Sequence, residues 1–180
     1  MNYKQISAIL LAAGKSERLG TPKQLMPWQG TTLLEFTFTT IQRSGFEDII
    51  VVLGAYAELV KQKINTHNMR IVYNASWESG KASSIRAGLN AISTNAEGVM
   101  IFLCDQPFLS RELIRKIQEA AGESTAEIIA PKVAERWSNP VFFKKKAFPS
   151  FYILKGEEGG KDLFSRYTMK AVLWSDLRIL

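Results

Sequence analysis

The feature that most constrains the fold is the run Ile6–Ala12, which is nearly all apolar and ends shortly before Gly14. A short apolar run without polar alternation predicts a strand that is buried on both faces. Similar runs recur at 48–53 and 98–104. Because strands of this kind lie in parallel sheets covered by helices on both sides, we expect an α/β fold.

Segments with helical spacing separate these strands. We expect helices at 31–44, 55–64, 81–92, 109–121 and 159–167, and shorter strands at 70–74, 127–131, 140–143 and 170–174. Alternating strands and helices predict right-handed βαβ crossovers, and hence a mostly parallel, Rossmann-like sheet with helices on both faces. No repeat or linker interrupts residues 1–180, so we expect one domain.

The composition excludes several classes of protein. Cys104 is the one cysteine of the sequence, which excludes an internal disulfide, and His67 is the one histidine, which argues against a serine–histidine–aspartate triad. No apolar run reaches the roughly 18 residues of a membrane helix, and no signal-peptide cleavage pattern follows the first run, so we expect a cytoplasmic protein. The net charge is +6, but only 144–146 form a lysine cluster, so we expect no nucleic acid partner.

The segment after the first strand has the composition of a phosphate-binding loop. It reads LAAGKSERLGTPKQL from Leu11 to Leu25, with two glycines and the cations Arg18 and Lys23. Backbone N–H groups and cations around such a loop suit a polyphosphate. The segment is neither a Walker A loop nor a dinucleotide-binding GxGxxG pattern, and a plain turn is the alternative.

Two further segments follow predicted strands, at the sheet edge where α/β proteins bind ligands. Asp105 follows 98–104 in LCDQP, where a carboxylate suits a cation such as Mg²⁺, with a helix cap or salt bridge as the alternative. The segment Asn74–Leu89, NASWESGKASSIRAGL, opens a helix at Gly80. Its first N–H groups can hold a polar ligand, although its serines also suit helix caps.

Together, the three segments resemble the MobA-like nucleotidyltransferase family, whose patterns LAAGxSxRxGxPKxL, NxxWxxGxxxSxxxGL and LxDQP they match. The resemblance extends from about Ile6 to Phe164, with molybdenum cofactor cytidylyltransferases as the nearest members. It implies a fold of the nucleotide-diphospho-sugar transferase type, Mg²⁺ as cofactor, and transfer of CMP from CTP to a molybdopterin-type phosphate with release of pyrophosphate. LAAG, in place of the LAGG of guanylyltransferases, favours CTP.

The resemblance also assigns the residues of the nucleotide side. It implies nucleotide contacts at Leu11, Ala12, Ala13, Gly14, Ser16, Gly80 and Ser84. Arg18 and Lys23 would stabilise the charge on the departing pyrophosphate, and Asp105 would hold Mg²⁺. Asp176, in VLWSDLRIL, is the candidate for the family's second metal carboxylate, although it matches the family segment LDVDTPEDL poorly.

The acceptor side departs from the family pattern. Asn139-Pro140 stands where the family has His-Pro, and Gly156–Leu163 resembles GDxGxRxLL with Glu157 and Lys161 in place of Asp and Arg. By resemblance, the acceptor would contact Asn139, Pro140, Gly159 and Gly160. A sugar-phosphate or isoprenoid-precursor acceptor is therefore an alternative, as is a catalytically silent molybdenum cofactor chaperone. The partner served would be a molybdenum hydroxylase.

Overall fold

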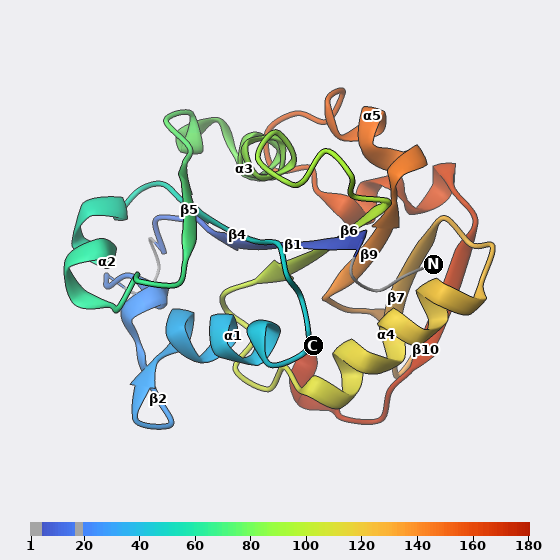
Figure 1. Cartoon of the computed structure of the whole chain (residues 1–180), viewed down its shortest axis with the longest axis horizontal. Coiled ribbons are helices and arrows are strands. Elements are labelled where there is room, and N and C mark those ends of the chain that lie inside the picture. Colours follow the sequence, from blue (N-terminus) through green and yellow to red (C-terminus); the bar gives the residue numbers. More distant parts are fainter. Residues whose placement is uncertain (1–4, 17–19) are drawn as a thin grey trace.

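The computed structural model describes residues 5–16 and 20–180. Its centre is a sheet with the strand order β10-β7-β9-β6-β1-β4-β5, and β8 pairs with β7 (Figure 1). The strands are β1 (Ile6–Ala12), β4 (Ile49–Leu53), β5 (Arg70–Tyr73), β6 (Gly98–Leu103), β7 (Ile128–Val133), β8 (Arg136–Trp137), β9 (Val141–Lys144) and β10 (Met169–Leu173).

Most neighbouring strands of the sheet run parallel. β1 lies between β4 and β6 and is parallel to both, β5 is parallel to β4, and β10 is parallel to β7. β9 is antiparallel to both β6 and β7, because the chain returns from β7 through the short strand β8 rather than through a crossover helix. The predicted mostly parallel α/β fold is confirmed, with β9 as the strand whose direction the sequence did not reveal.

Helices cover both faces of the sheet (Figure 1). They are α1 (Leu33–Gln42), α2 (Ala57–Lys63), α3 (Lys81–Leu89), α4 (Arg111–Glu123) and α5 (Phe148–Phe151). α1 and α4 lie on one face, and α3 and α5 on the other (Figure 1). α1 begins with a capping box between Thr32 and Glu35, and α4 begins where the Ser110 hydroxyl accepts from the Leu113 N–H.

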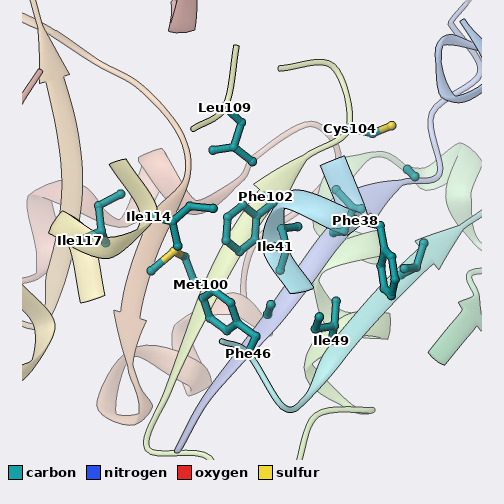
Figure 2. Packing of buried hydrophobic residues seen from close by; sticks show 14 of the residues in the cluster. Phe38, Ile41, Phe46, Ile49, Met100, Phe102, Cys104, Leu109, Ile114 and Ile117 are labelled. Atoms are coloured by element: carbon teal, nitrogen blue, oxygen red, sulfur yellow. The ribbon is translucent and has the colours of Figure 1, made fainter. Parts of the chain in front are cut away.

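Two apolar clusters fill the space between the sheet and its helices. On the α1 and α4 face, Phe46 packs edge-to-face on Phe102 with ring centroids 5.7 Å apart, beside Met100 (Figure 2). On the opposite face, Phe143 packs on Phe151 at 4.9 Å. Each such side chain contributes roughly 1.5–3 kcal/mol when fully buried. The central strands therefore form a rigid base for the loops at their ends.

Several short elements were not expected from the sequence. A two-stranded hairpin, β2 (Pro27–Trp28) and β3 (Thr31–Thr32), precedes α1, and its strands are too short for a periodic pattern. The helix expected at 159–167 is a 3₁₀ helix, η6 (Gly160–Arg166). Further 3₁₀ helices among the described residues are η3 (Lys23–Leu25), η4 (Trp77–Ser79), η5 (Lys145–Ala147) and η7 (Leu177–Ile179). Among the described residues, no helix is both long and apolar enough to cross a membrane.

Candidate active site

A cavity of about 700 Å³ opens at the carboxyl ends of β1 and β6, next to the start of α3. Parallel α/β sheets bind ligands at this edge. Apart from Asp176, the lining includes all the residues of the predicted nucleotide side that the structure describes: Leu11, Ala12, Ala13, Gly14, Ser16, Lys23, Gly80, Ser84 and Asp105. Arg18 lies outside the described residues.

Lys23 and Asp105 form an ion pair at this cavity. The Lys23 Nζ donates to Asp105 Oδ2 at 3.1 Å, and the Lys23 backbone N–H donates to the Ser16 hydroxyl at 3.1 Å. The two charged side chains are 36% and 45% exposed. Because an exposed pair of this kind contributes roughly 0–1 kcal/mol to stability, the fold does not depend on it. The salt bridge that the sequence analysis gave as an alternative for Asp105 is therefore present. The residue that pairs with Asp105 is Lys23, which is itself a candidate site residue.

The carboxylate of Asp105 suits a divalent cation that also binds phosphate. Among the described residues, no group of three or more His, Cys, Asp and Glu side chains is arranged to hold a metal ion. Mg²⁺ commonly binds one or two protein carboxylates together with substrate phosphates and water, so Asp105 suits such an ion.

Asp176 is not among the residues that line the cavity. Its two carboxylate oxygens accept from the Arg178 guanidinium at 2.8 and 2.7 Å, and Oδ1 also accepts from the Arg178 N–H at 3.1 Å. The hydrogen bonds from the Arg178 side chain lower the pKa of Asp176. The structure therefore gives this carboxylate a partner, and does not bring it into the cavity with Asp105.

The start of α3 is in direct backbone contact with a later loop. Gly80 precedes the helix with a φ of 98°, and a Cβ there would overlap the carbonyl carbon of Gly156. Ala82 N–H donates to the Gly156 carbonyl at 3.0 Å, and the Arg86 guanidinium donates to the Leu154 carbonyl at 2.7 Å. Because a side chain at Gly80 would displace this loop, glycine is required there.

The serines after Gly80 form a buried hydrogen-bond network. Asn74 Nδ2 donates to the hydroxyls of Ser83 and Ser84 at 2.8 and 3.0 Å, and the Ser83 hydroxyl donates to the Gly80 carbonyl at 2.8 Å. The alternative that these serines cap the helix is therefore wrong, because Gly80 is the N-cap of α3 and no side chain caps it. The network instead orients Ser84 at the wall of the cavity.

Cys104 lies next to Asp105 and also lines the cavity. Burial, and then the Asp105 charge, raise the pKa of its thiol to about 12. The thiol is therefore protonated at neutral pH and is a poor nucleophile. This agrees with a reaction in which the substrate itself supplies the nucleophile.

The predicted acceptor residues lie in two places, Gly159 and Gly160 next to the start of α3 and the Phe143 ring, and Asn139 and Pro140 between β8 and β9. Gly159 packs against Lys81, a cavity residue, and a Cβ on Gly159 would lie 3.0 Å from the Lys81 Cδ. Gly160 follows it and packs against the Phe143 ring. Asn139-Pro140 lies between β8 and β9, joined by a cis peptide, and neither residue lines the cavity.

The sequence analysis did not identify several lining residues as part of the site. They are Lys15, Gln24, Trp77, Glu78, Lys81, Leu103, Cys104 and Glu157. Gln24 is the clearest omission, because it is buried and donates two hydrogen bonds to the loop after β1. Its position inside the pattern PKxL, at the variable residue, gave no signal. Lys81 could have been predicted, because it directly follows Gly80 and is the first residue of the helix expected at the ligand-binding edge.

The α/β fold, with a phosphate-type loop at the carboxyl edge of its sheet, is the one expected of a nucleotidyltransferase domain. The chain belongs to the MobA-like NTP transferase domain family, whose model matches residues 8–172. The family resemblance of the three sequence segments is therefore confirmed.

Individual relatives differ in their named roles. The chain is 28% identical to the purine catabolism protein PucB of Bacillus subtilis over 91% of this chain and 82% of that protein. It is 31% identical to the molybdenum cofactor cytidylyltransferase of Escherichia coli over 62% and 57% of the two chains. It is 41% identical to the nicotine blue oxidoreductase of Paenarthrobacter nicotinovorans over 58% of this chain, and the match spans 52% of that protein, about half its length.

Solved structures share the fold of this chain. The crystal structure of Rv0371c from Mycobacterium tuberculosis superposes with a TM-score of 0.87 at 29% identity, covering 97% of this chain and 90% of that one. A second structure of the same protein is a complex with manganese, at a TM-score of 0.84, 26% identity, and coverage of 96% and 89%.

Proposed function

We propose that this protein transfers CMP from CTP to the phosphate of a molybdopterin-type acceptor and releases pyrophosphate. The observation that carries the proposal is the Lys23–Asp105 pair at a cavity lined by the loop 11–16 and the start of α3. A cation, a carboxylate, backbone N–H groups and a helix start around one cavity are what a nucleoside triphosphate with its metal requires.

The chemistry requires little of the protein beyond position and charge. An acceptor phosphate oxygen attacks the α-phosphorus of CTP, and the bond from that phosphorus to the departing pyrophosphate breaks in line with the attack. A phosphate monoester has a second pKa of about 6, so the nucleophile is already ionised at neutral pH. Lys23 stabilises the charge on the departing pyrophosphate. Asp105 would hold Mg²⁺, which would supply positive charge next to the phosphates.

A group of cations on the acceptor side supports an anionic acceptor. Lys161 Nζ donates to the Trp137 carbonyl at 2.7 Å, and burial, then Lys81 and then Arg136, lower the pKa of Lys161. Within the described part of the chain, none of these three cations forms an ion pair with a carboxylate. Positive charge without a counter-charge favours the binding of a phosphate.

The named relatives support the finer proposal in two ways. The Escherichia coli relative supports CTP and the molybdenum cofactor as substrates. The Bacillus subtilis relative is named for purine catabolism, and on this basis we propose a purine-oxidising molybdenum hydroxylase as the enzyme served.

The test is pyrophosphate release from CTP, GTP, ATP and UTP in Mg²⁺, with and without molybdopterin. We expect release from CTP only when molybdopterin is present. Release with a sugar phosphate or an isoprenoid-precursor phosphate, and none with molybdopterin, would instead identify a different acceptor. Binding of molybdenum cofactor without release from any nucleotide would indicate a chaperone and overturn the enzymatic proposal.

A further inference from the structure

Gln24 is a buried amide that lines the nucleotide cavity, with 3% of its surface exposed. Its Nε2 donates to the Ala12 carbonyl at 2.6 Å and to the Gly14 carbonyl at 3.0 Å. The two acceptors fix the orientation of the amide, because the reverse orientation would place Oε1 against two carbonyl oxygens. One side chain thus holds two carbonyls of the loop that follows β1.

The carbonyls of Ala12, Ala13 and Gly14 all accept hydrogen bonds within the protein. Gln24 donates to the first and the third, and the Ala13 carbonyl accepts from the Ala55 N–H at 3.1 Å. Carbonyl oxygens repel phosphate, so bonds that hold them to the protein favour an anion at the loop. In a trans peptide the N–H points opposite to the C=O, so the N–H groups that follow Ala12 and Gly14 face away from Gln24.

Gln24 also connects this loop to Lys23. Both residues belong to η3, and the Lys23 N–H donates to the Ser16 hydroxyl at 3.1 Å. η3 is therefore joined to the loop at Ala12, Gly14 and Ser16. The position of the Lys23 ammonium and the shape of the loop depend on the same set of bonds.

We propose that Gln24 is the positioning residue of the nucleotide site, which holds the 12–16 loop and Lys23 in the arrangement that receives the triphosphate before nucleotide binds. This inference rests on the proposed function, because it requires a nucleoside triphosphate in the cavity. Among the described residues, Gln24 Oε1 is buried without a hydrogen-bond partner. A buried acceptor without a partner destabilises a fold, which suits a residue that serves the site rather than stability.

The experiment compares two substitutions of Gln24 with a matched control. Gln24→Met keeps the length of the side chain and removes only the amide, so the fold is expected to survive. Gln24→Glu keeps the size but removes the donor. Gln118→Met is the control, because Gln118 is also buried and its Nε2 donates to the Ser44 carbonyl at 3.3 Å from α4, away from the cavity.

The measurements are the Kd of CTP in Mg²⁺ by calorimetry, KM and kcat, and the melting curve of each variant. We expect Gln24→Met to raise the Kd and KM of CTP about tenfold, with a larger increase for Gln24→Glu, because preorganisation of the loop is lost. The KM for the acceptor should stay within about twofold. Gln118→Met should lower the melting temperature and leave the Kd of CTP unchanged.

The outcomes separate this inference from the proposed function. If the parent binds CTP and folded Gln24→Met binds it within about threefold of the parent, the positioning role is overturned. An equal rise in the Kd of CTP for Gln118→Met would also overturn it, because the effect would then be one of stability. If the parent binds none of the four nucleotides, the proposed function is wrong. The positioning role of Gln24 is then wrong as well, because it requires a bound nucleotide. If Gln24→Glu does not fold, Gln24→Met decides the question.

Discussion

The residues that line the cavity come mainly from the segments after β1 and β6 and from the start of α3, which is the predicted nucleotide side. The predicted acceptor side lies in later loops around 139–140 and 156–161, and of these positions Glu157 lines the cavity. On the nucleotide side, polar side chains hold the loop after β1, and the strands beneath are buried on both faces. On the acceptor side, side chains and N–H groups of α3 and η6 contact backbone carbonyls.

This difference indicates that residues on the predicted acceptor side can be substituted without loss of the nucleotide side. The contact to the carbonyl at 157 does not involve the exposed side chain of Glu157, whereas Gly156 has a φ of 54° that favours glycine and Leu154 is buried in the core. The acceptor side is also where the sequence departs from the family pattern, at Asn139, Glu157 and Lys161. We therefore expect substitutions on the nucleotide side to remove the chemistry, and substitutions on the acceptor side to change which acceptor is used.

The largest effect is expected for Asp105→Asn. The amide is nearly the same size, but it removes the charge that would hold the metal, so turnover should fall by about 10³-fold or more. The exposed ion pair with Lys23 contributes roughly 0–1 kcal/mol, so the melting temperature without ligand should change little. Activity, Mg²⁺-dependent CTP binding and melting curves check this. Retained Mg²⁺-dependent activity would place the ion elsewhere, and a collapsed melting curve would make Asp105 structural.

Lys23→Ala should have the next largest effect. It removes one charge that stabilises the departing pyrophosphate, a loss of about 10²-fold or more in turnover. Arg18→Ala is expected to behave alike, as the sequence pattern predicts. Lys63→Ala is the matched control, because Lys63 is exposed on α2 and does not line the cavity. Steady-state rates of the folded variants within about threefold of the parent would contradict the assignment.

A smaller effect is expected for the choice of nucleotide. A purine should overfill a pocket between Ala12, Ala13 and the helix start at Gly80, at a cost of roughly 1–3 kcal/mol. CTP should therefore bind about 10- to 100-fold more tightly than GTP. Calorimetric titration of both nucleotides in Mg²⁺ measures the ratio. Tighter binding of GTP would show that the base lies outside this pocket.

The smallest effect is expected on the acceptor side. Lys161→Gln should raise the KM for the acceptor about tenfold and leave the KM for CTP unchanged. Lys155→Gln is the matched control, because the Lys155 side chain is exposed in the loop that precedes η6. A change in the KM for CTP, and none in that for the acceptor, would assign Lys161 to the nucleotide side instead.

The pH dependence sharpens the same prediction. Burial and neighbouring cations lower the pKa of Lys161, so it loses its positive charge at a lower pH than an exposed lysine. The KM for the acceptor should therefore rise as the pH increases, before exposed lysines titrate. Lys161→Arg, which restores the family residue, should shift that rise to higher pH, because arginine stays charged. A rise at the same pH in parent and Lys161→Arg would show that another group titrates.

The sequence predicted the central strands well because their burial leaves a direct pattern. The runs at 6–12 and 98–104 correspond to β1 and β6 nearly to the residue. Because these strands are parallel neighbours, the segments that follow them reach one edge, and their predicted residues line one cavity. The roles of these residues stay predictions that the substitutions above test.

Other features depend on contacts that spacing does not reveal. The run at 140–143 has the same pattern in either direction, and only the short return through β8 makes β9 antiparallel. Asp176 is bound by Arg178, two residues further on, a local pairing that a search for metal carboxylates overlooks. Gln24 resembles a surface glutamine in the sequence, and only the folded loop buries it.

The close approach of Gly80 to Gly156 has a consequence for evolvability. At that point the two sides of the cavity meet backbone to backbone, with no space for a side chain on Gly80. Their spacing is therefore independent of the side chains that select the acceptor. A library for a new acceptor can vary 157, 158 and 161 while it keeps both glycines, and the alignment of the reacting phosphates would be inherited unchanged by every member.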